Sequence, residues 1–171
     1  MDKYLIPIST LFIGLNGIIA IMLSYIVAAE RTKTRIWHGE SKEDILKQPD
    51  ALANPNAWAA FVEDMTQNFL SSATIDDGAL QRKVRAHANF TEYVPLALLF
   101  IIALELMHSN IWLLWLLGVS LTVARIAHAW GLINTYGSSP GRAFGFFLTW
   151  FVYIFGSLGC IYYALLSLLY N

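Results

Sequence analysis

The feature that most constrains this chain is a series of long apolar stretches with few or no charges. Residues 5–29 contain no charged side chain, and neither do residues 143–169. A helix needs about 20 apolar residues to cross the hydrocarbon core of a bilayer. Two further stretches, 80–107 and 111–133, are apolar for much of their length. The pattern predicts an all-α integral membrane protein with four transmembrane helices, over about 5–29, 80–107, 111–133 and 142–169.

Composition excludes several other classes of protein. Of the 171 residues, 57% are hydrophobic and 13% are charged, whereas soluble domains have about 25% charged residues. A soluble enzyme or a disordered chain is therefore excluded, and the net charge of −1 argues against a nucleic-acid partner. The single cysteine rules out an in-chain disulfide, and the histidines lack a ligand spacing, so we predict no metal site. Because four spans use most of the chain, we predict one domain, residues 1–171.

The first apolar stretch has an alternative interpretation as a cleaved signal peptide. Its length far exceeds the roughly 7–15 apolar residues of a signal peptide, and the residues before it carry no net positive charge. We therefore expect it to be retained as a transmembrane helix.

The basic residues predict how the chain is oriented in the membrane. They gather in the first and third connections, while residues 108–110 have no lysine or arginine. Connections rich in lysine and arginine stay in the cytoplasm, so we expect both chain ends to be external. The long cytoplasmic connection, 30–79, contains a helical pattern of apolar residues over about 55–70. This amphipathic helix is expected to cap the protein, to lie on the membrane or to form a plain surface helix.

Several polar residues fall inside the predicted spans and share faces of their helices. Charged side chains in a span are costly and usually face the interior of a bundle or a wet cavity. Ordinary explanations are snorkelling or ion pairs, such as Glu92 with Arg85 or Arg125. Four arginines with one inner carboxylate nevertheless favour a site for an anionic, zwitterionic or thiolate-bearing ligand. The residues of these faces are Arg82, Arg85, Asn89, Glu92, Tyr93, Arg125, His128, Arg142, Thr149 and Tyr153.

Three lesser features also lead to expectations. Glu105, near the far end of the second span, is expected to be a surface residue close to a loop. Asn16 falls in the middle of the first span and is expected to hydrogen-bond across helices. Several glycines are expected to permit close helix packing: Gly14, Gly17, Gly141, Gly145, Gly156 and Gly159.

One segment of the second span resembles a family signature. Residues 82–96 read RKVRAHANFTEYVPL, which is similar to the R-x-x-R-A-x-x-N-x-x-E-Y-x-P pattern of the MAPEG family, the membrane-associated proteins in eicosanoid and glutathione metabolism. The resemblance continues in the R-x-x-H of Arg125 and His128 and in the S-P-x-R that ends at Arg142. The sequence of this segment most resembles that of a bacterial member similar to the microsomal glutathione transferases.

The resemblance implies a fold, an assembly and a ligand. It implies a left-handed four-helix bundle that forms a homotrimer, with glutathione as co-substrate between neighbouring subunits near the cytoplasmic face. Arg142 resembles the catalytic arginine that stabilises the glutathione thiolate. Arg31 resembles an arginine that pairs with a glutathione carboxylate, and Arg35 is a second candidate for that role. The remaining residues implied to bind glutathione are Arg85, Asn89, Glu92, Tyr93, Arg125 and His128.

The expected function is that of a membrane-bound glutathione transferase, with or without peroxidase activity, in a bacterial inner membrane. A free thiol has a pKa near 8.5, and a nearby cation lowers it, so an arginine suits the activation of glutathione. The second substrate is expected to be a lipophilic molecule delivered from the bilayer into an apolar groove between the first and fourth helices. The alternative is a non-catalytic member that binds lipids or acts as a scaffold.

Overall fold

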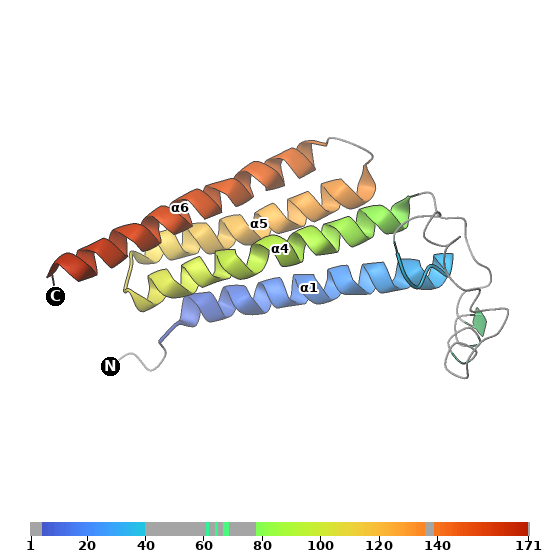
Figure 1. The fold of residues 1–171 in the computed structure, drawn as a ribbon, viewed down its shortest axis with the longest axis horizontal. Coiled ribbons are helices and arrows are strands. Elements are labelled where there is room, and N and C mark those ends of the chain that lie inside the picture. The colour runs from blue at the N-terminus through green and yellow to red at the C-terminus, as the bar shows by residue number, and fades with distance from the viewer. Residues whose placement is uncertain are drawn as a thin grey trace.

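The fold is a bundle of four long helices that run lengthwise beside one another (Figure 1). The computed structural model describes residues 5–39, 61, 64, 67–68, 78–135 and 139–170. Each of the four helices is long and apolar enough to cross a membrane, which confirms the prediction of an all-helical chain with four candidate spans. The helices are α1 (Pro7–Thr34), α4 (Ala79–Leu106), α5 (Ile111–Asn134) and α6 (Pro140–Tyr170).

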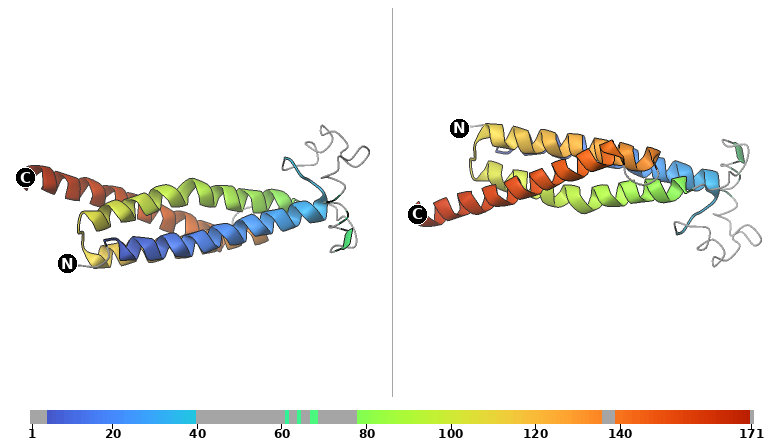
Figure 2. Two further views of the ribbon diagram at one scale, coloured as in Figure 1. Left: turned by 90° about the horizontal axis from the view of Figure 1, so that it is seen from below. Right: turned by 90° about the horizontal axis from the view of Figure 1, so that it is seen from above.

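Helices α4 and α5 form the middle of the bundle. They contact each other, and each also contacts both α1 and α6. Helices α1 and α6 lie on opposite sides of this pair, and α6 crosses it obliquely (Figure 2). Among the described residues α1 and α6 do not pack against each other, so the apolar groove expected between the first and fourth helices is not formed by this part of the chain.

The contact between α1 and α5 depends on one aromatic ring and one glycine. Phe12 is buried, and a Cβ atom on Gly118 would lie 2.1 Å from its ring, so only glycine leaves room for it there. One turn further, the Nδ2 of Asn16 donates to the carbonyl of Phe12 (2.9 Å) and to the Oγ1 of Thr122 on α5 (3.2 Å). The predicted hydrogen bond of Asn16 across helices is confirmed.

The predicted roles of the glycines divide by position. Gly156 and Gly159 on α6 pack against Phe100 and Leu104 of α4, as expected. Gly14 and Gly17 are exposed on α1, and a Cβ atom at either would meet nothing within 4 Å. The prediction that these two allow close packing is wrong for the described part of one chain, because they face away from α4 and α5.

Glu105 was expected at the surface, and that expectation is wrong. Its side chain is buried, with 8% of the residue exposed, and it caps the start of α1. One carboxylate oxygen accepts from the backbone N–H of Ile8 (2.9 Å) and the other from that of Ser9 (2.7 Å). Pro7 has no N–H to satisfy. A carboxylate from α4 thus satisfies the open donors at the positive end of α1.

Helix α1 extends about one turn beyond its predicted end and includes charged residues. Glu30 is buried and its carboxylate pairs with the ammonium group of Lys83 on α4 at 2.6 Å. Arg31 donates to the carbonyls of Ile36 (3.1 Å) and Gly39 (3.0 Å), beyond the left-handed C-cap at Arg35. These bonds keep the last turn helical where hydropathy alone predicts the end of the span.

The amphipathic helix expected over 55–70 lies largely outside the described residues. Within it the structure describes residues 61, 64, 67 and 68, which are helical and exposed.

Candidate functional site

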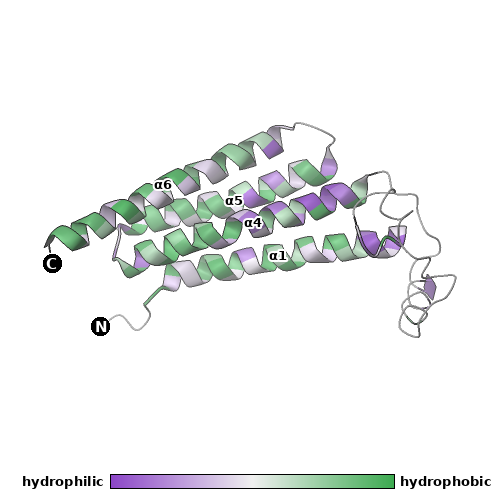
Figure 3. Ribbon diagram, in the orientation of Figure 1, coloured by the Kyte–Doolittle hydropathy of each residue, from purple (hydrophilic) through white to green (hydrophobic). Residues whose placement is uncertain are grey.

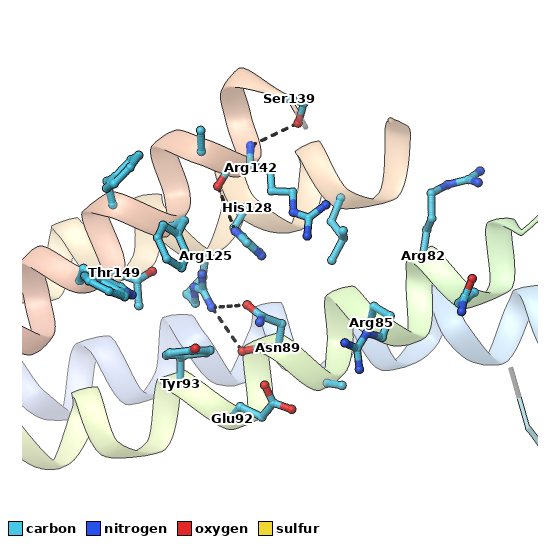
Figure 4. A pocket seen from close by; sticks show the side chains of 17 residues that line it. Arg82, Arg85, Asn89, Glu92, Tyr93, Arg125, His128, Ser139, Arg142 and Thr149 are labelled. Atoms are coloured by element: carbon cyan, nitrogen blue, oxygen red, sulfur yellow. Dashed lines mark hydrogen bonds between the residues drawn. The ribbon is translucent and has the colours of Figure 1, made fainter. Parts of the chain in front are cut away.

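A cleft opens at the polar end of the bundle, where α1 and α5 end and α4 and α6 begin. Hydrophilic residues concentrate at this end (Figure 3). The cleft has a volume of about 750 Å³, within the range of small-molecule sites. Its walls come from α4, α5 and α6, and its polar lining comprises Gln81, Arg82, Arg85, Asn89, Glu92, Tyr93, Arg125, His128, Ser139, Arg142 and Thr149. Figure 4 shows the cleft from close by, with Arg125 reaching from α5 toward Asn89 on α4, and Arg142 at the start of α6 beside His128.

The α4 wall follows from helical spacing. Its polar residues recur at intervals of three and four, which places them on one face. The neighbouring face of the helix carries Ala86, Phe90, Val94 and Ala97, all of which are buried. The apolar face packs against the bundle and so turns the polar face toward the cleft.

The position of Arg142 depends on a close crossing of α5 and α6. A Cβ atom on Gly145 would lie 2.4 Å from the carbonyl oxygen of Ala124, and one on Gly131 would lie 2.5 Å from the backbone nitrogen of Arg142. The Nδ1 of His128 donates to the backbone carbonyl of Arg142 (3.1 Å), because a carbonyl can only accept. These contacts hold the first turn of α6 against α5, as the expected packing role of Gly141 and Gly145 requires.

Arg125 is the most buried charge in the cleft, with 3% of the residue exposed. Its Nη1 donates to the side-chain oxygen of Asn89 (3.0 Å) and to the backbone carbonyl of Asn89 (3.3 Å). Its guanidinium carbon lies 5.5 Å from the centre of the Tyr93 ring. No carboxylate among the described residues pairs with it. The ion pair with Glu92, considered from the sequence, is therefore not formed in the described chain.

Arg85 and Glu92 are both exposed on α4 and line the same cleft. Neither forms a hydrogen bond or an ion pair with any residue that the structure describes, so the ordinary explanation of a mutual salt bridge does not apply here. Arg82 differs, because its Nε donates to the carbonyl of Ile133 at the end of α5 (3.1 Å). The cleft thus combines several guanidiniums with one carboxylate.

Comparison with known proteins assigns the chain to a family. The model of the MAPEG family matches residues 9–162. The chain belongs to the MAPEG family. Two curated relatives are each 31% identical to this MAPEG protein over 52 residues: the inner membrane protein YecN of Escherichia coli strain K12 and its namesake in E. coli O6:H1 strain CFT073. That match covers 30% of this chain and 40% of the relatives' length. No solved structure matches the chain.

The structure brings most of the predicted site residues of this MAPEG protein together. Arg85, Asn89, Glu92, Tyr93, Arg125, His128 and Arg142 all line the cleft. Arg31 does not line it, since its guanidinium binds carbonyls beyond the end of α1. Arg35 is also outside the cleft, and its Nη1 donates to the carbonyl of Thr32. Tyr153 does not line the cleft, but its hydroxyl donates to the carbonyl of Tyr93 (2.8 Å), which does line it.

Sequence reasoning missed the aromatic wall of the cleft. Phe146, Phe147 and Trp150 on α6 line it, and the rings of Phe146 and Trp150 are 5.1 Å apart. Apolar residues are expected everywhere in a span, so these three carried no distinguishing signal. The spacing of Phe146 and Trp150, about one and two turns beyond Arg142, was the only clue that they lie near its face. Among the described residues, no three His, Cys, Asp or Glu side chains gather to hold a metal ion.

Proposed function

We propose that this MAPEG protein is a membrane-bound glutathione transferase, active as a homotrimer in a bacterial inner membrane with both chain ends external. Glutathione is its co-substrate, and a lipophilic electrophile from the bilayer is its second substrate. Peroxide reduction is a further reaction that the same thiolate chemistry would permit.

The observation that carries the proposal is the pair of unpartnered opposite charges in the cleft. Glutathione has two carboxylates, one ammonium group, two peptide bonds and a thiol. Arg85 offers a fork of donors for a carboxylate, and Glu92, at the other end of one helical face, offers an acceptor for the ammonium group. Because neither residue has a partner in the described chain, both remain available to a zwitterionic ligand.

Arg142 suits the chemical step. It lies at the start of α6 and lines the cleft, and an arginine side chain supplies a positive charge with several hydrogen-bond donors. A cation beside the sulfur lowers the pKa of the thiol, so the proton leaves to solvent and a thiolate remains. The thiolate then forms a carbon–sulfur bond with the electrophile, and the leaving group departs with the bonding electron pair.

The exposure of the site supports an assembly of several copies. Arg85 and Glu92 face outward from a helix that spans the membrane, where contact with lipid would cost several kcal/mol per charge. A neighbouring copy would cover them. It would also supply an α1 helix opposite α6, and Arg31 would reach glutathione from that neighbour.

The test is an assay of the purified protein in lipid nanodiscs with glutathione and chlorodinitrobenzene. The expected result is saturable glutathione binding by calorimetry and formation of the conjugate, followed by its absorbance, above the rate in empty nanodiscs. Reduction of an organic hydroperoxide tests the peroxidase reaction in the same preparation. Binding without conjugation of any electrophile would favour the non-catalytic, lipid-binding or scaffold alternative. Absence of glutathione binding would overturn the proposal.

A further inference from the structure

The hydrogen bond between Arg125 and Asn89 fixes the orientation of the Asn89 carboxamide. An arginine side chain carries donors only, and a carboxamide carries one acceptor and one donor group. Arg125 Nη1 lies 3.0 Å from the side-chain oxygen of Asn89, and its reach across from α5 to both oxygens of Asn89 is visible in Figure 4. The opposite orientation of the amide would set donor against donor. Arg125 therefore determines which way the amide of Asn89 faces.

The other end of that amide is open. None of the described residues accepts a hydrogen bond from the Nδ2 of Asn89, although Asn89 lines the cleft. An amide group that loses its bonds to water without gaining a partner costs free energy. The Nδ2 is thus a pair of donors directed at whatever occupies the cleft.

The Nη1 end of Arg125 is engaged by Asn89, whereas its buried Nε has no hydrogen-bond partner among the described residues. Two oxygens of Asn89 accept from Nη1, and the ring of Tyr93 lies under the guanidinium carbon. Arg85, by contrast, is exposed and has no partner among the described residues. Arg125 and Arg85 therefore have different tasks, although both are arginines of one cleft.

We propose that Arg125 is a positioning residue that locks the carboxamide of Asn89 with its NH₂ group toward the cleft. Asn89 then selects ligands that present a carboxylate or carbonyl oxygen at this point. The inference deepens the proposed function and rests on it for the identity of the ligand. The lock itself is a property of the protein without ligand.

Two substitutions test the NH₂ group of Asn89 separately from the hydrogen bond that Arg125 donates to its oxygen. Asn89→Asp keeps an oxygen for Arg125 but replaces the donor group by a second acceptor. We expect its thermal unfolding midpoint not to fall, because the new carboxylate can pair with the guanidinium of Arg125, and its glutathione affinity to fall about tenfold or more, as for loss of a hydrogen bond to a charged group. Asn134→Asp is the matched control, since Asn134 is exposed, donates to the carbonyl of Trp130 within α5 and does not line the cleft. That variant should bind glutathione as the wild type does.

A double-mutant cycle distinguishes positioning from direct contact. We expect Arg125→Lys to weaken glutathione binding about threefold to tenfold in the wild type and less than twofold in an Asn89→Ala background, because residues that act as one unit are not additive. Equal, additive losses in both backgrounds would overturn the proposal, since Arg125 would then contact the ligand itself. Unchanged glutathione affinity in Asn89→Asp would overturn it too, because the donor would then have no role.

A measurement without ligand keeps the lock testable if the proposed function fails. In asparagine-labelled protein, the side-chain NH₂ signal of Asn89 is identified by its loss in Asn89→Asp. We expect one ordered signal in the wild type and an averaged, shifted signal in Arg125→Lys. If the wild type does not bind glutathione, the proposed function is wrong, and this signal alone then tests whether Arg125 orients the amide of Asn89. An Asn89 signal that Arg125→Lys leaves unchanged would refute it.

Discussion

At the scale of single residues, the charges of this protein fall into two groups with different chemistry. Glu30 and Glu105 are buried, and each has bonding partners that fix one helix relative to another. Arg125 is buried too and bonds to Asn89 across helices, but no described carboxylate pairs with it and its Nε has no partner among the described residues. Arg85 and Glu92 are exposed in the cleft and have no partner among the residues that the structure describes. A buried charge must be compensated within the protein, whereas an exposed, unpartnered charge beside a cleft is available to a ligand. The division therefore separates the structural charges from the candidates for binding.

Arg142 is the residue on which the proposed chemistry depends. Only about 3% of a thiol with a pKa near 8.5 is ionised at pH 7. We therefore expect Arg142→Ala to bind glutathione but to turn over about thirtyfold more slowly at pH 7. Its rate should approach that of the wild type as the pH rises to 9, because bulk hydroxide then ionises the thiol. Arg142→Lys should be intermediate, since lysine supplies charge without the guanidinium geometry.

The measurement for Arg142 is the pH profile of turnover together with the ultraviolet absorbance of the bound thiolate. The backbone contacts of Arg142 with His128 and Ser139 do not depend on its side chain, so both variants are expected to fold. Wild-type thiolate absorbance and a wild-type pH profile in Arg142→Ala would show that this guanidinium does not ionise the thiol.

Glu105 leads to a prediction about stability. Glu105→Gln leaves one oxygen for the two N–H groups of Ile8 and Ser9 and removes the negative charge from the start of α1. We expect a loss of about 1–3 kcal/mol, the cost of an unsatisfied buried donor, read as a lower midpoint of thermal unfolding in detergent. Asp64→Asn is a control, because Asp64 is exposed and should tolerate the change. An unchanged midpoint in Glu105→Gln would mean that the cap contributes nothing.

At the scale of the helices, the glycines of α6 differ in what they permit. A Cβ atom on Gly145 would lie 2.4 Å from a backbone oxygen of α5, whereas one on Gly159 would lie 3.2 Å from the end of a leucine side chain. We expect Gly145→Ala to destabilise the protein by about 1–3 kcal/mol and to weaken glutathione binding, because the wall with His128 and Arg142 must move. Gly159→Ala is the matched control on the same helix, with a smaller loss of stability and unchanged binding. Thermal unfolding and calorimetry measure both, and equal stability of the two variants would contradict the prediction.

The helices also show what the sequence could and could not predict. Hydropathy indicated the four spans, and helical spacing placed Asn89 and Glu92 on one face, because both depend on the order of residues alone. The sequence alone could not predict which residues pair across helices. The cap that Glu105 provides for α1 and the lock that Arg125 provides for Asn89 join residues far apart in the chain. Which of two similar glycine pairs faces a neighbouring helix also depends on the packing, so Gly14 was misjudged and Gly145 was not.

At the scale of the whole molecule, the described chain leaves much of its surface to be covered. The outer faces of α1 and α6 are exposed and apolar, as Ile21 and Tyr25 on α1 and Leu158 on α6 illustrate, which suits contact with lipid or with other helices. Glu92 is different. It is an exposed carboxylate near the middle of α4, and a carboxylate at the centre of a span costs about 2.5–3.5 kcal/mol on insertion scales. The neighbouring copy that we propose would account for this position, whereas contact with lipid would not.

The exposed position of Glu92 leads us to expect an oligomer, and the proposed trimer sets the number of copies. We expect the protein released from nanodiscs to have a native mass of three times the 19.2 kDa of one chain. If a neighbour covers Glu92 in a wet site, Glu92→Leu should leave the unfolding midpoint unchanged or lower it, and glutathione binding should weaken. Thr91→Leu is the matched control, because Thr91 is exposed on the adjacent position of α4 and lies outside the cleft lining. A single-chain mass, together with a raised midpoint in Glu92→Leu, would mean that the carboxylate faces lipid. In that case the cleft would be a site of one chain, and neither Arg31 nor a second α1 helix could take part in it.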